Sequence, residues 1–63
     1  MNKTKVTTLV IQNKLYHVHT KRVLSGFTGY VIHEGDFLMS LPEHHQEQKV
    51  IDAADQRIRD FIS

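Results

Sequence analysis

Two histidines separated by one residue are the first feature of the sequence that could do chemistry. His17 and His19 would share one side of a β-strand, because side chains two positions apart point the same way, and imidazole is a common zinc ligand. A metal site needs a third protein ligand, which His33, His44 or His45 would have to supply. His44 and His45 would diverge by about 100° on a helix, and the chain has no cysteine. We therefore expect no metal and no cofactor.

Signatures of catalysis are equally weak. None of the serines has a nucleophile motif around it, and the glycines are spaced as in strand turns rather than as in a phosphate-binding loop. A chain of 63 residues also has little room for a substrate pocket of roughly 300 Å³ or more. We therefore expect a protein that is not an enzyme.

The composition is that of a small folded domain with balanced charge. Hydrophobic residues make up 40% of the chain and the net charge is +1, which argues against a disordered chain, an acidic nucleic-acid mimic and a strongly basic arm. The first 33 residues hold five Lys or Arg and no acid, whereas all seven acids follow residue 33. Apolar runs are too short for a membrane helix, which needs roughly 18 residues, and no signal peptide is evident. We expect one cytoplasmic domain over residues 1–63.

Three turn signals divide the first forty residues into strands. Stretches rich in Val, Thr, Leu and Ile favour β-structure, and Asn13-Lys14, Ser25-Gly26 and Glu34-Gly35 each suit a two-residue hairpin loop. These loops predict antiparallel strands, paired in a meander, over about 4–12, 15–24, 27–34 and 36–40.

The spacing of the apolar residues changes after Pro42 to that of a helix with one apolar face, whose members are Val50, Ala54, Ile58 and Phe61. Ser40 and Glu43 have the spacing of a capping box, and Pro42 suits the first turn of a helix. The helix is therefore expected over about 42–62. The fold class that follows is α+β, an antiparallel sheet of three to four strands with one C-terminal helix packed on one face.

The predicted pairing sorts the strand residues onto two faces, and one helix can cover only one of them. The face with no charge at its centre is the better core, and it holds Leu9, Ile11, Tyr16, Val18, Leu24, Phe27, Val31 and Leu38. The second face mixes apolar, aromatic and basic side chains and is expected to be available for contacts. Val6 and Leu15 belong to it. Its candidates for a protein interface are Val10, His17, His19, Tyr30, Ile32, Phe37 and Met39.

We expect a small binding protein that acts through contacts with proteins. It would be a homo-oligomer, or a modulator or inhibitor of a larger partner, and its length also permits a protein encoded by a phage or mobile element. The alternative is a nucleic-acid-binding module, in which cations hold phosphates and an aromatic ring stacks a base. The residues for that alternative are Lys3, Lys5, Lys21, Arg22 and Tyr30. Neither function involves a membrane.

Overall fold

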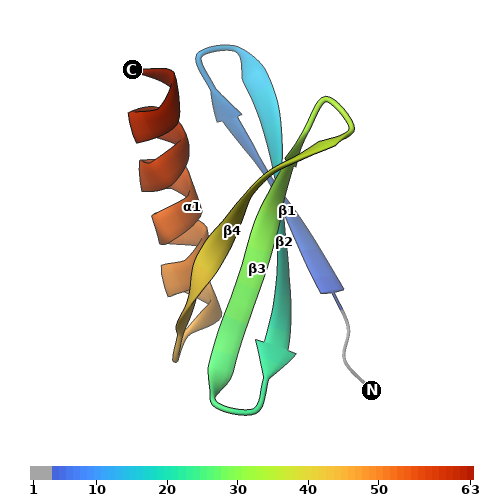
Figure 1. Cartoon of the computed structure of the whole chain (residues 1–63), viewed down its shortest axis with the longest axis vertical. Coiled ribbons are helices and arrows are strands. Elements are labelled where there is room, and N and C mark those ends of the chain that lie inside the picture. Colours follow the sequence, from blue (N-terminus) through green and yellow to red (C-terminus); the bar gives the residue numbers. More distant parts are fainter. Residues whose placement is uncertain (1–3) are drawn as a thin grey trace.

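The computed structural model describes residues 4–63, which form a four-stranded antiparallel sheet and one helix (Figure 1). The strands follow one another across the sheet in chain order, so each strand pairs with its neighbours in sequence. This arrangement confirms the predicted α+β meander with a C-terminal helix on one face. The elements are β1 (Thr4–Ile11), β2 (Lys14–Val23), β3 (Gly26–His33), β4 (Asp36–His44) and α1 (Glu47–Ile62).

All three hairpins close with two-residue loops, but two of the loops lie one residue earlier than predicted. The first loop is Gln12-Asn13, and both residues have positive φ, 52° and 65°. Positive φ at both positions matches the right-handed twist of the flanking strands. The second loop is Leu24-Ser25. The third is Glu34-Gly35, as predicted, with φ values of 54° and 81°.

Gly26 explains the position of the second loop, because it is needed in β3 rather than in a turn. Its φ is +153°, and a Cβ at this position would lie 2.3 Å from the carbonyl oxygen of His44. A residue without a side chain is required where another backbone approaches this closely. Leu24 therefore occupies the loop and is fully exposed, instead of lying on the core face as predicted.

The displaced loops change the cross-strand partners but leave the two faces as predicted. Leu9, for example, lies opposite Tyr16 instead of Val18, and the pairing of β2 with β3 is displaced by the same amount. Moving a hairpin loop by one residue along the chain shifts the cross-strand pairing by two residues. Since side chains alternate along a strand with a period of two, every residue of β1 to β3 keeps its face.

Strand β4 extends further than predicted, and the helix begins later. The strand continues through Pro42 to His44, and α1 starts at Glu47 rather than near residue 42. Proline is tolerated in β4 because this is an edge strand, and proline also favours extended backbone at the residue before it. The residue that precedes the helix, Gln46, makes no side-chain capping bond. The predicted capping box of Ser40 and Glu43 therefore does not start the helix.

The core lies between α1 and one face of the sheet, and its buried apolar members are Ile11, Tyr16, Val18, Val31, Leu41, Val50, Ala54 and Ile58. The helical stripe predicted from the sequence continues to Ile62, which packs against this core. Phe61 instead faces solvent and is 65% exposed. Leu41 joins the core because β4 continues past the end that the sequence predicts.

A polar cluster fixes the first turn of the helix to the sheet. Thr20 is fully buried, and its hydroxyl donates a hydrogen bond to Glu47 Oε2 at 2.8 Å. Lys5 Nζ lies 3.6 Å from Glu47 Oε1. A carboxylate in the first helical turn is also stabilised by the helix dipole. The cluster therefore helps to hold α1 over the face on which Thr20 lies.

Candidate protein-binding face

The sheet face opposite α1 is left uncovered by the part of the chain that the structure describes (Figure 1). We call it the open face. Two rows of paired residues cross it, one pair beside the first loop extends it at one end, and Lys21 extends it at the other. The open face comprises Val6, Thr8, Val10, Leu15, His17, His19, Lys21, Tyr30, Ile32, Phe37 and Ser40.

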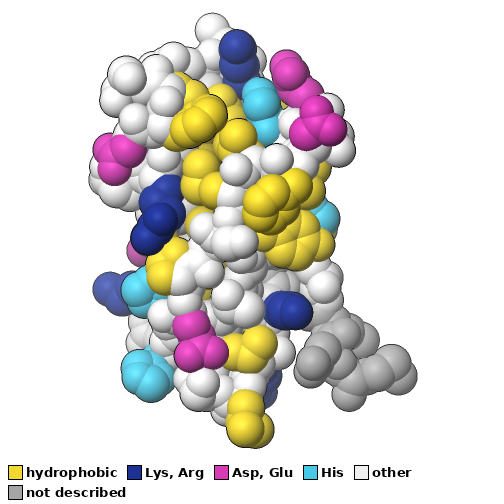
Figure 2. Space-filling model, viewed as in Figure 1, with side chains coloured by type: hydrophobic (Ala, Val, Ile, Leu, Met, Phe, Trp, Pro, Cys, Tyr) yellow, Lys and Arg dark blue, Asp and Glu magenta, His cyan; other side chains and the backbone are white. Residues whose placement is uncertain are grey.

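Much of the open face is apolar and exposed to solvent. The exposed fractions are 51% for Val6, 65% for Val10, 52% for Leu15 and 61% for Phe37. In Figure 2, hydrophobic side chains gather beside a histidine on the flank of the molecule away from the helix. A single exposed hydrophobic residue is ordinary, whereas a contiguous group is typical of an interaction site.

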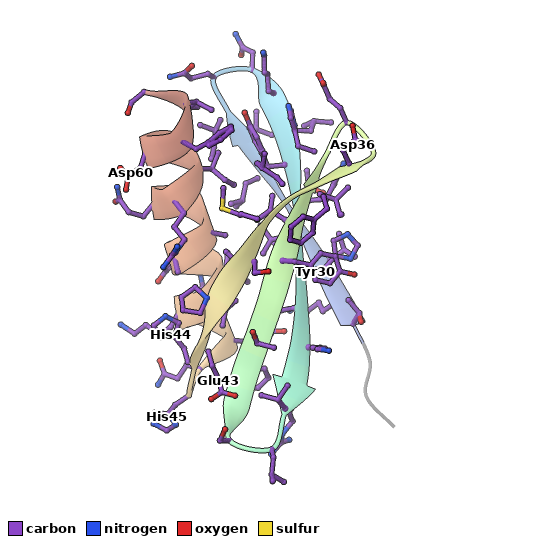
Figure 3. All side chains as sticks on the ribbon, in the orientation of Figure 1. Tyr30, Asp36, Glu43, His44, His45 and Asp60 are labelled. Carbon is purple, nitrogen blue, oxygen red and sulfur yellow. The ribbon has the colours of Figure 1, made fainter. Side chains whose placement is uncertain are left out.

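Aromatic rings organise the centre of the open face. The rings of His19 and Tyr30 are stacked, with centroids 4.8 Å apart and planes 8° apart, and Tyr30 lies 6.3 Å from the ring of Phe37. Figure 3 shows Tyr30 on the side of the sheet away from the helix. Thr8 Oγ1 and His17 Nδ1 are hydrogen-bonded at 3.1 Å. These contacts restrict the side chains before any partner binds.

Met39 is the predicted interface residue that the structure moves to the other side of the sheet. Ile32 pairs with Phe37, but Val31 pairs with Met39, so Leu38 is an additional residue in β4. Such a β-bulge interrupts the alternation of side chains, and Met39 consequently packs against the core. The other predicted interface residues do lie on the open face, and they are Val10, His17, His19, Tyr30, Ile32 and Phe37.

The residues predicted for nucleic-acid binding do not converge. Lys3 lies outside the described residues. Lys5 forms an ion pair with the first turn of the helix, and Arg22 lies on the helix side of β2 because it alternates with Lys21. Lys21 is on the open face with Tyr30, whose ring is already stacked on a histidine. Among residues 4–63, Lys21 is therefore the one cation of the predicted set that shares a face with Tyr30.

A small hollow of about 160 Å³ lies between the second loop and the start of the helix. It is lined by Ser25, Glu43, His44 and His45, and Figure 3 labels the last three. Ser25 donates a hydrogen bond to Glu43 Oε1 at 3.0 Å, whereas nucleophilic serines are activated by a base such as histidine. A wider, open depression of about 460 Å³ continues past Gln46 and Lys49. No three His, Asp or Glu side chains of the described chain are grouped to hold a metal. Nothing in this hollow assembles the parts of a reaction centre.

Val6 and Leu15 are as prominent on the open face as the residues selected from the sequence. Both follow the alternation of their strands, so their place on this face is readable from the sequence once the strands are assigned. The Thr8–His17 hydrogen bond depends on the observed pairing of β1 with β2. It is missed when the loop is placed one residue too late.

No protein-family model, curated protein or solved structure matches the chain. Within residues 4–63, the one helix is neither long nor apolar enough to cross a membrane. Function must therefore be inferred from the surface of the molecule itself.

Proposed function

We propose that this is a non-enzymatic binding protein whose open face contacts the surface of another protein. The observation that supports it best is that α1 covers one face of the sheet, while four apolar side chains on the other face are half or more exposed. Contact with a partner would remove this apolar area from water, a gain of roughly 25 cal/mol per Å². The stacked rings of His19 and Tyr30 lower the entropy cost of binding, because they are ordered beforehand.

The size of the open face suits a transient contact. Strands of 8 to 10 residues, at roughly 3.3 Å per residue and about 4.8 Å between strands, give a projected area on the order of 500 Å². Stable interfaces bury roughly 800 Å² per partner, and weaker signalling or redox contacts bury less. One open face alone would therefore give modest affinity.

The charge of the open face indicates the chemistry of the partner. Lys21 carries the one fixed charge among the residues that make up this face, and it lies at the end away from the first loop. A complementary surface would be apolar at its centre, with a carboxylate at the rim opposite Lys21. A rim contact of this kind tunes association rate more than affinity.

A matched pair of phenylalanines allows a sharp test. Phe37 is 61% exposed on the open face, and Phe61 is 65% exposed on the helix, so the two differ in location rather than in type or exposure. A photoreactive phenylalanine analogue placed at either position is cross-linked in extract of the source cells. We expect position 37 to give a discrete protein adduct that is competed by excess wild type but not by Phe37→Asp.

Position 61 serves as the control, and it should give no adduct of that size. Equal adducts from both positions, or none from position 37, would contradict the proposal. The nucleic-acid alternative makes a separate prediction, since labelled single-stranded oligonucleotide should then bind at low salt and Lys21→Glu should abolish that binding. We expect no such binding.

A further inference from the structure

β1 is an edge strand that lacks the features by which the other edge is protected. In β4, Pro42 and two register irregularities discourage pairing with another strand. The helix also packs mainly over β3 and β4 and least over β1 (Figure 1). β1, by contrast, pairs regularly with β2 over Thr4–Ile11, with no proline and a single lysine.

The first loop determines which backbone groups of β1 point away from the sheet. Ile11 and Lys14 flank this two-residue loop, so they exchange backbone hydrogen bonds within the hairpin. Because the bonding alternates along an antiparallel pair, every second residue back to Lys5 also directs its N–H and C=O toward β2. The outward groups therefore belong to Thr4, Val6, Thr8 and Val10, whose side chains all lie on one side of the sheet.

We infer that β1 pairs antiparallel with β1 of a second copy of this chain. With a twofold axis at Thr8, each Thr8 lies opposite its counterpart, and Val6 lies opposite Val10 of the other copy. All of these residues direct their backbone groups outward, so each pair exchanges two hydrogen bonds. The valines brought together are 51% and 65% exposed in a single copy.

The sequence of β1 favours this register over its neighbour. Lys5 is the charged residue of β1, and it lies opposite Ile11 of the other copy, so like charges do not meet. An axis at Thr7 would instead place Val6 opposite Thr8 and lose both valine contacts. Apolar side chains match apolar ones when the axis is at Thr8, and this self-complementarity identifies a second copy as the occupant of the edge.

The resulting dimer has one continuous sheet with both helices on the same side. Its two open faces join into a surface on the order of 1,000 Å², twice the single-copy area, which reaches the size of specific interfaces when a partner covers it. The pairing goes beyond the proposed function and does not rest on it. It uses the backbone edge of β1, whereas the proposed contact uses side chains of the open face.

Sedimentation equilibrium of Thr8→Pro tests the edge directly. Proline at this position removes an outward N–H and leaves the bonds between β1 and β2 in place, so the circular dichroism of the monomer should be unchanged. We expect a wild-type dimer and a dissociation constant about tenfold higher or more in the variant. If Thr8→Pro does not fold, Val6→Lys with Val10→Lys is the second variant, because charged side chains also block an edge.

Leu15→Lys is the matched control for the valine variant. Leu15 is 52% exposed on the same face, but it lies on β2, which has a strand on each side. The dissociation constant of the Leu15→Lys dimer should stay close to that of the wild-type dimer. A monomeric wild type at millimolar concentration, or equal weakening by Leu15→Lys, would overturn the inference and exclude a second copy at this edge.

Nitroxide spin labels then test the register. At Thr8→Cys the two labelled backbones should lie about 5.5 Å apart, whereas at Ser40→Cys on β4 they should be roughly 34 Å apart, seven strand spacings. Strong dipolar broadening at position 8 and none at position 40 is expected, and the reverse pattern would contradict edge pairing. Phe37→Asp should keep the dimer, so failure of the edge and failure of the proposed function are distinguished.

Discussion

Thr20 is the buried polar side chain of the core, and its hydroxyl contacts both the helix and β1. It donates to Glu47 at the start of the helix and lies 3.4 Å from the carbonyl oxygen of Lys5 on β1. A buried donor without such a partner would cost about 1–3 kcal/mol. The exposed charge of Lys5, 66% accessible, contributes much less because solvent screens it.

Thr20→Val separates the hydrogen bond from the ion pair. Valine keeps the shape but leaves the Glu47 carboxylate without this donor, so we expect a loss of about 1–3 kcal/mol in the free energy of unfolding. Lys5→Gln should cost less than about 0.5 kcal/mol. Urea denaturation measures both variants. Equal losses would mean that the ion pair, rather than the buried hydroxyl, holds the helix.

Gly29 and Gly35 should respond differently to the same substitution. A Cβ at Gly29 would lie 2.1 Å from the backbone oxygen of His19, so Gly29→Ala should cost about 3 kcal/mol or prevent folding. At Gly35 nothing lies within 4 Å, but φ is +81°, so Gly35→Ala should cost only about 1 kcal/mol from backbone strain. Thermal or urea unfolding of both variants measures the two losses of stability. A smaller loss for Gly29→Ala than for Gly35→Ala would contradict the prediction.

At the scale of the elements, a strand keeps its predicted face when its register is displaced by an even number of residues, and changes face when the number is odd. The β1–β2 and β2–β3 registers were displaced by two residues, which keeps the faces. The bulge at Leu38 displaced β4 by one, and this moved Met39 from the predicted interface to the core. No glycine or other signal marks the bulge in the sequence. The helix start was missed because Pro42 suits an edge strand as well as a first helical turn.

The first loop offers a test in which the sign of the effect identifies the register. In the observed hairpin, Gln12→Asn with Asn13→Gly creates the preferred Asn-Gly loop and should add about 0.5–1 kcal/mol of stability. Lys14→Gly falls in strand β2 and should cost about 0.5–1 kcal/mol. If the loop were Asn13-Lys14, as the sequence suggests, Lys14→Gly would stabilise the protein. Urea denaturation of the two variants measures the sign.

The whole molecule separates charge from apolar surface. The outer side of the helix carries acids and arginines, among them Asp55 and Arg59, which are paired at 2.6 Å. The open face carries Lys21 as its one fixed charge within the described residues. The helix side is therefore strongly hydrated, while the opposite side of the molecule has less charge and more exposed apolar surface.

This separation predicts weak dependence on salt. The inferred dimer and the proposed contact through the open face would depend mainly on backbone hydrogen bonds and apolar contacts. Both dissociation constants should therefore change less than about threefold between 50 and 200 mM salt. A protein that contacts six or more phosphates would lose roughly 10³-fold or more in affinity over that range. Titrations at both salt concentrations distinguish the two kinds of binding, and a steep decline would favour nucleic acid.

The chain order of the meander and helix has a consequence during synthesis. The strands leave the ribosome first and pair with their neighbours in microseconds, the time scale of hairpin formation, which is roughly 1–10 μs. The 16 residues of α1 follow over about one to three seconds at roughly 5–20 residues per second. Until α1 docks, a sheet that has already formed exposes Val18 and Val31 on one side as well as the open face on the other. A chaperone that recognises apolar β-surface can bind in this interval, and docking of the helix ends it.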